Sequence, residues 1–80
     1  MDPRAREVSI RGEMIRLGQL LKLADIVGGG GEVKVYLAES EVTVNGEPEQ
    51  RRGRQLHPGD VVIANGTELR IVSRAGGELA

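Results

Sequence analysis

The stretch that decides the fold spans residues 42–54 and reads Val42-Thr43-Val44-Asn45-Gly46-Glu47-Pro48-Glu49-Gln50-Arg51-Arg52-Gly53-Arg54. Its first three residues show the alternation of a β-strand, in which successive side chains point to opposite faces. The next two, Asn and Gly, accept the positive φ of a type I′ turn, so the pattern predicts a β-hairpin. Three arginines then follow within four positions, with no acid between them. A basic stretch beside a hairpin favours a small nucleic-acid-binding module.

Composition limits both the size and the chemistry of the protein. Eighty residues form one small domain. The core must be built from Val, Leu, Ile and Ala, because the sequence has no Phe or Trp and a single Tyr. The absence of Cys excludes disulfides and thiolate metal sites, and it fits a reducing cytoplasm.

The N-terminus lacks the apolar run of a signal peptide, and no segment approaches the ~20 apolar residues that span a bilayer. We therefore expect a cytoplasmic protein with no membrane partner.

The net charge of −1 counts against a general nucleic-acid binder, because strong binders are usually basic overall. Any affinity must come from an uneven distribution of charge. Residues 50–59 contain three arginines and no acid, whereas Glu47 and Glu49 lie just upstream. The alternative interpretation of these arginines is a solvated basic loop.

The first half of the chain contains one clear strand, one clear helix and one ambiguous segment. Residues 7–11 alternate and predict a short strand. Apolar residues spaced along one helix face predict a helix at about 18–25, with Gly18 as its N-cap. The glycines at 28–31 cannot sustain a helix, and without a phosphate-loop motif around them we interpret them as a flexible connector. Residues 32–40 fit a strand and a helix equally well.

The second half predicts a turn followed by a second hairpin. Pro58-Gly59 fits a type II turn, because Pro fixes φ and Gly supplies the positive φ. Asn65-Gly66 is a second hairpin signal, between a strand at 61–63 and a strand at 67–72. We expect a flexible N-terminus over residues 1–7, a single domain over residues 8–72, and a flexible tail over residues 73–80.

Four segments at these spacings resemble one known family. They are Arg16-Leu17-Gly18-Gln19-Leu20-Leu21-Lys22, Val42-Thr43-Val44-Asn45-Gly46, Arg51-Arg52-Gly53-Arg54 and Pro58-Gly59-Asp60-Val61-Val62. The chain is similar to the S-four-type RNA-binding domain, which is named after a ribosomal small-subunit protein and is also called the alpha-L RNA-binding motif. The likeness runs from about Val8 to Val72, and it is strongest to the small stand-alone bacterial members.

The resemblance implies an α+β fold in which two short helices pack on a small bent antiparallel sheet. It also implies that residues 32–39 form the second helix. The implied partner is structured RNA, with ribosomal RNA and translation as the expected context. Carried over by position, the RNA-binding candidates are Arg16, Lys22, Lys34, Arg51, Arg52 and Arg54. Glycines 29–31 replace a Ser-Arg pair found in many members, so Lys34 alone supplies charge on the second helix.

Catalysis has little support in the sequence. His57 is the only histidine and precedes a Pro-Gly turn, and no nucleophile is paired with a base. The acids near the arginines are scattered. We therefore expect no enzyme, no cofactor and no metal site.

Two other partners stay open at this point. The chain could be a protein-interaction module that docks its basic hairpin on an acidic protein surface, or the same arginines could bind DNA. Tyr36 has the spacing of a buried helix position, so we expect it to pack in the core rather than to stack on bases. If the partner is RNA, we expect recognition through shape and backbone rather than through stacked bases.

Overall fold

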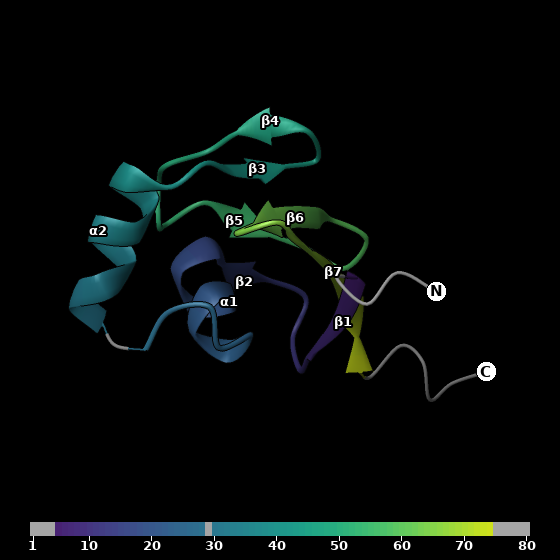
Figure 1. Cartoon of the computed structure of the whole chain (residues 1–80). Coiled ribbons are helices and arrows are strands. Elements are labelled where there is room, and N and C mark those ends of the chain that lie inside the picture. The colour runs from purple at the N-terminus through teal and green to yellow at the C-terminus, as the bar shows by residue number, and fades with distance from the viewer. Residues whose placement is uncertain (1–4, 29, 75–80) are drawn as a thin grey trace.

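The structure is a computed structural model that describes residues 5–28 and 30–74. Within these residues, two helices and seven strands follow one another: β1 (Ala5–Ile10), β2 (Ile15–Arg16), α1 (Leu17–Leu23), α2 (Gly30–Glu39), β3 (Val42–Val44), β4 (Glu47–Pro48), β5 (Gln55–Leu56), β6 (Val61–Ala64) and β7 (Thr67–Ser73). In Figure 1 the helices lie side by side at one end, and β1 and β7 lie at the other. This α+β arrangement confirms the expected fold class.

Five strands form the main sheet in the order β1-β7-β6-β3-β4, and β2 pairs with β5 in a small second sheet. Both predicted hairpins are present as antiparallel pairs, β3 with β4 and β6 with β7. The φ angles at Asn45 and Gly46 are 52° and 88°, and those at Asn65 and Gly66 are 55° and 75°. Positive φ at both central residues is what a type I′ turn requires.

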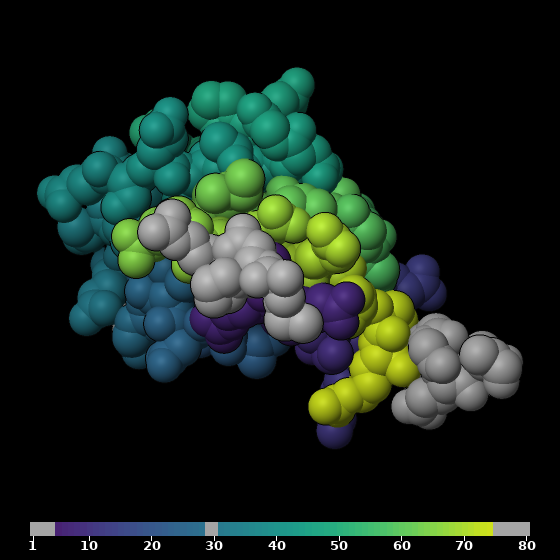
Figure 2. Space-filling model, turned by 45° about the vertical axis from the view of Figure 1, so that its right-hand side comes forward, coloured from purple at the N-terminus to yellow at the C-terminus, as the bar shows by residue number. Residues whose placement is uncertain are grey.

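Strand β1 makes the main sheet mixed rather than wholly antiparallel. It runs parallel to β7, from Ala5 opposite Glu68 to Ile10 opposite Ser73. Figure 2 shows the yellow residues of β7 on the surface next to purple residues of β1. A parallel pair needs a long connection between its strands, and here almost the whole domain provides it.

This pairing also shifts the expected ends of the domain. Residues 5–7 belong to a strand rather than to a flexible N-terminus, and Ser73 belongs to β7. The remainder of the two terminal segments lies outside the described residues.

Helix α1 begins at Leu17, one residue earlier than its sequence pattern predicted. Its N-cap is Arg16, with φ −88° and ψ 151°, and not Gly18. The side-chain oxygen of Gln19 accepts a hydrogen bond from the Arg16 N–H at 3.2 Å. The helix ends where Asp25 adopts a φ of 63°, a left-handed conformation that stops helical geometry.

Helix α2 confirms the helix implied for residues 32–39, but it begins at Gly30, inside the glycine run. The first backbone N–H groups of a helix have no partner within it, so glycine costs less there than in a helix interior. The carboxylate of Glu32 accepts a hydrogen bond from the Gly28 N–H at 3.0 Å and stabilises this start. Part of the glycine run therefore belongs to the first turn of α2 and is not only a connector.

The core lies between the helices and the sheet and consists of aliphatic side chains. Its largest fully buried members are Leu17, Leu20, Leu21, Leu37, Leu56, Leu69, Ile71, Val42, Val44 and Val62. Tyr36 is half-buried and packs against this cluster, as its spacing predicted. Within the described residues, no helix is long and apolar enough to cross a membrane.

Candidate nucleic-acid interface

The loop with the three arginines is tied by its backbone to the start of α1. The carbonyl oxygens of Arg54 and Arg52 accept hydrogen bonds from the N–H groups of Leu17 and Gly18, both at 2.9 Å. The carbonyl oxygen of Gly53, between them, accepts one from the Arg16 side chain at 3.0 Å. Two of the unpartnered N–H groups at the helix start are thus satisfied by a segment more than thirty residues away.

Gly18 allows this close approach. A Cβ atom at this position would lie 3.2 Å from a Val33 methyl carbon on α2 and 3.3 Å from the Cβ of Arg52. Both distances are tighter than ordinary van der Waals contact. Gly18 is therefore needed where α1, α2 and the arginine loop meet, which is a packing role rather than the capping role expected from the sequence.

A shallow hollow of about 410 Å³, here called the basic hollow, opens at this junction. Its lining includes three cationic side chains from two distant segments, Arg16 and Lys22 around α1 and Arg52 in the loop. No carboxylate from the described part of the chain lines it. The side chains of Lys22 and Arg52 form no hydrogen bond or ion pair with any described residue, so their charges face solvent.

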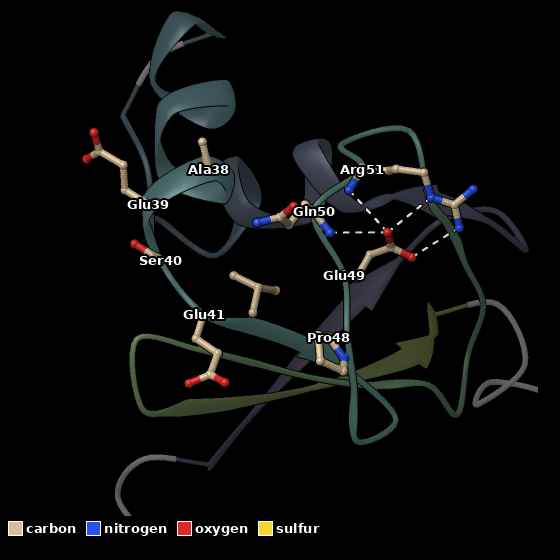
Figure 3. A pocket seen from close by; sticks show the side chains of 9 residues that line it. Ala38, Glu39, Ser40, Glu41, Pro48, Glu49, Gln50 and Arg51 are labelled. Carbon is tan, nitrogen blue, oxygen red and sulfur yellow. Dashed lines mark hydrogen bonds and ion pairs between the residues drawn. The ribbon is translucent and has the colours of Figure 1, made fainter.

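The other two arginines of the loop are held by Glu49, whose side chain is only 8% exposed. Its carboxylate accepts a hydrogen bond from Arg54 at 2.8 Å and two from Arg51 at 3.1 and 3.2 Å. The backbone N–H groups of Gln50 and Arg51 each donate to it at 3.1 Å. Figure 3 shows the contacts to Gln50 and Arg51. We call Glu49, Arg51 and Arg54 the Glu49 cluster.

These contacts shift the pKa values of Glu49 and Arg51. Hydrogen bonds from Arg51 and then Arg54 lower the pKa of Glu49 from 4.5 to about 2, against the opposing effect of burial. The same carboxylate raises the pKa of Arg51. Glu49 is therefore charged at neutral pH and offsets much of the positive charge of its two arginines.

The structure thus divides the six candidates from the sequence. It brings Arg16, Lys22 and Arg52 together in the basic hollow and assigns Arg51 and Arg54 to the Glu49 cluster. Lys34 is exposed on α2, one residue after Val33, but it does not line the hollow. The three arginines of the loop therefore do not share one environment: Arg51 and Arg54 pair with Glu49, whereas Arg52 lines the basic hollow.

Sequence reasoning also missed the central role of Glu49, which it treated as scattered surface charge. The available signal was its spacing, two and five residues before Arg51 and Arg54, but nothing local indicates that its carboxylate is buried. The Glu49 N–H donates to the Val42 carbonyl at 2.9 Å, which fixes the position of Glu49 at the end of the hairpin.

The hairpin turn at Asn45-Gly46 and the segment 58–62 are joined by hydrogen bonds. The side chain of Asn45 donates to Asp60 at 3.1 Å and accepts from the Val61 N–H at 2.9 Å, and Asp60 accepts from the His57 N–H at 2.8 Å. Burial tends to raise the pKa of Asp60, but the hydrogen bonds from His57 and Asn45 outweigh it and the pKa is lowered. The φ of 99° at Gly59 completes the predicted turn. These residues position the loop and do not line the basic hollow.

In the described ranges 5–28 and 30–74, no three His, Asp or Glu side chains gather as metal ligands would.

The sequence matches the S4 domain family over residues 8–72. The chain therefore belongs to the S4 domain family, as its resemblance to the S-four-type RNA-binding domain predicted. A relative in Bacillus subtilis (strain 168), named Probable ribosome maturation protein RlbA, is 56% identical over 62 residues. That alignment covers 78% of this chain and 87% of the relative.

Proposed function

We propose that the protein binds structured RNA, with ribosomal RNA as its target, and that the basic hollow is its main contact surface. The observation that supports this most directly is the convergence of Arg16, Lys22 and Arg52 on one concave surface without a carboxylate among its described lining residues. Arginine pairs bidentately with phosphate oxygens, and lysine acts as a point charge toward them. A chain with a net charge of −1 can hold a polyanion only through such a local concentration of charge.

The remaining candidates have smaller roles in this proposal. Lys34 is exposed on α2, one residue after Val33, and in this proposal it contacts a phosphate outside the basic hollow. Arg51 is 76% exposed and can still donate to RNA with the edge that Glu49 does not occupy, while Arg54 mainly fixes the loop. With about three phosphates neutralised, the logarithm of affinity should fall against the logarithm of salt with a slope of about −2 to −3.

The process that we propose is ribosome assembly or maturation in a bacterial cytoplasm. Its support is the name of the Bacillus relative together with the family. In this proposal the protein acts by binding and positioning RNA and catalyses no reaction.

The test measures binding to folded ribosomal RNA fragments by fluorescence anisotropy. The double variant Lys22→Gln/Arg52→Gln should lose about 100-fold in affinity, since each charge-assisted contact is worth roughly tenfold. The control variant Arg6→Gln/Arg70→Gln removes the same charge from β1 and β7 and should lose less than about threefold.

Equal losses in the two variants would overturn the proposal, because they would show that net charge and not the hollow governs binding. Competition with duplex DNA and with polyglutamate separates the other partners. Either competitor displacing the RNA at equal concentration would favour DNA or an acidic protein instead.

A further inference from the structure

A second hollow lies between the end of β1 and α1 and has a different character from the first. It measures about 480 Å³ and shares one lining residue, Gln19, with the basic hollow. Met14 and Leu23 line it and are 40% and 57% exposed, which makes them two of the four large apolar side chains exposed on the described surface. Arg11 and Arg74 line it as well, and no carboxylate does so in the described part of the chain.

The fold does not explain why Leu23 is exposed. The core-facing side of α1 is formed by Leu17, Leu20 and Leu21, each of which is fully buried. Leu23 lies off that face and contributes little to the core, as its exposure shows. Leaving such a side chain in water forgoes the favourable free energy that its full burial would provide. An exposed apolar pair in one hollow is more informative than scattered single residues, because contiguous apolar surface marks interaction sites.

We propose that this hollow docks a short protein segment that presents one or two large apolar side chains flanked by carboxylates. The apolar side chains would cover Met14 and Leu23, and the carboxylates would pair with Arg11 and Arg74. Within residues 5–28 and 30–74, neither arginine forms an ion pair. The lining includes Met14 and two arginines, residue types that are enriched at protein interfaces, and it has no Lys, Asp or Glu within the described ranges, which are types depleted there.

The chemistry of the hollow favours protein over RNA as its occupant. An RNA helix presents phosphates and ribose hydroxyls, which would gain nothing from contact with Met14 and Leu23. An unpaired base stacks on an aromatic ring or on a guanidinium plane, and Tyr36, the only aromatic residue in the chain, does not line this hollow. Stacking here would therefore use Arg11 or Arg74 and would give Met14 and Leu23 no apolar partner. The size of the hollow suits a single strand or helix turn rather than a whole domain.

Because Gln19 lines both hollows, a segment docked here would lie directly beside RNA in the basic hollow. The protein would then connect an RNA site to a protein partner at the same place. The docking of the segment does not depend on RNA binding, since it uses Arg11 and Arg74 and not the cations of the basic hollow.

The test places a photo-crosslinking benzoylphenylalanine at position 23 of the full chain in living cells. A control chain has the same group at Ile63, which is 43% exposed on β6 and lies outside the hollow. After ribonuclease treatment, mass spectrometry identifies the crosslinked peptides. We expect position 23, and not position 63, to yield protein peptides with an apolar residue next to Asp or Glu.

The identified segment is then synthesised and titrated against purified variants. Leu23→Ser and Arg11→Glu/Arg74→Glu should each weaken its binding by about tenfold or more. Leu23→Ser leaves charge unchanged and should keep RNA affinity, whereas Lys22→Gln/Arg52→Gln should keep peptide affinity and lose RNA. The proposal is overturned if position 23 crosslinks only to RNA or to nothing, if both positions capture the same proteins, or if the synthetic peptide binds all variants equally.

Discussion

Arg51 and Arg52 are neighbours in sequence, yet they lie in opposite electrostatic surroundings. Arg51 belongs to the Glu49 cluster, where its guanidinium donates two hydrogen bonds to the buried Glu49 carboxylate. Arg52 lines the basic hollow with Arg16 and Lys22, and its side chain has no partner among the described residues. The difference teaches that a run of like charges in a sequence does not measure the charge that a ligand meets. What matters is which cations the fold has already paired.

The two regions are also mechanically linked. Glu49 orders the loop from one side, and the carbonyl oxygens of Arg52 and Arg54 attach it to α1 from the other. The Glu49 cluster can therefore be understood as the support that holds Arg52 in the basic hollow. This division of roles is tested by variants that change either the Glu49 cluster or the cations of the basic hollow, but not both.

The largest effect on stability is expected for Glu49→Gln. It removes the negative charge that accepts hydrogen bonds from Arg51, Arg54 and two backbone N–H groups. Hydrogen bonds to a charged group contribute more to stability than hydrogen bonds between neutral groups. We expect a loss of roughly 1.5–3 kcal/mol in the free energy of unfolding, with little of it from Arg51 because that side chain is 76% exposed. Urea denaturation measures it. Glu47→Gln, an exposed neighbour, is the control and should change stability by less than about 0.5 kcal/mol.

A comparable effect is expected where α1 meets the loop. Gly18→Gln places a side chain against Val33 and Arg52 and should cost about 1–3 kcal/mol, although Gln is the better helix former. Gly12→Gln is the matched control, because a Cβ atom there meets nothing within 4 Å. Thermal unfolding of both variants measures the difference. If Gly18→Gln proves as stable as the control, the junction is looser than described and cannot fix the position of Arg52.

The two adjacent arginines should differ in RNA binding. Arg52→Gln is expected to lower affinity about tenfold, or about 1.4 kcal/mol, without changing stability. Arg51→Gln should lower it less than about threefold, because Glu49 already offsets much of its charge. Binding isotherms on the same ribosomal RNA fragment give both values. Equal losses would mean that RNA displaces Glu49 from Arg51, and the division between the two regions would then fail.

The stabilisation by Glu49 should also depend on pH. The pKa of Glu49 is lowered in the folded protein to about 2 from 4.5, so its charge stabilises the fold fully above pH 4.5 and less as the pH falls toward 2. The difference in unfolding free energy between the wild type and Glu49→Gln should therefore be constant above pH 4.5. It should fall toward zero as the pH is lowered from 4.5 to about 2. The titration of Asp60 affects both proteins equally, so its contribution cancels in this difference. A difference that persists unchanged at pH 2 would contradict the assigned pairing.

The local features of the fold could be predicted from the sequence. Asn45-Gly46, Asn65-Gly66 and Pro58-Gly59 all form the predicted turns, because the φ angles that a residue tolerates depend on that residue and its neighbours. The buried face of α1 follows in the same way from its helical spacing. Segment 32–39 was ambiguous by periodicity, and only the family resemblance identified it as a helix.

Tertiary structure alone decided the pairing of β1 with β7, the N-cap of α1, and which arginines remain available. Each depends on atoms that are distant in sequence, such as the Gly18 N–H and the Arg52 carbonyl oxygen, and no local pattern records such a distance. The sequence determined that cations and a hairpin occur together. The fold determined that Glu49 is buried next to two of those cations and that Arg16, Lys22 and Arg52 meet on one surface, because burial and proximity are properties of the packed chain.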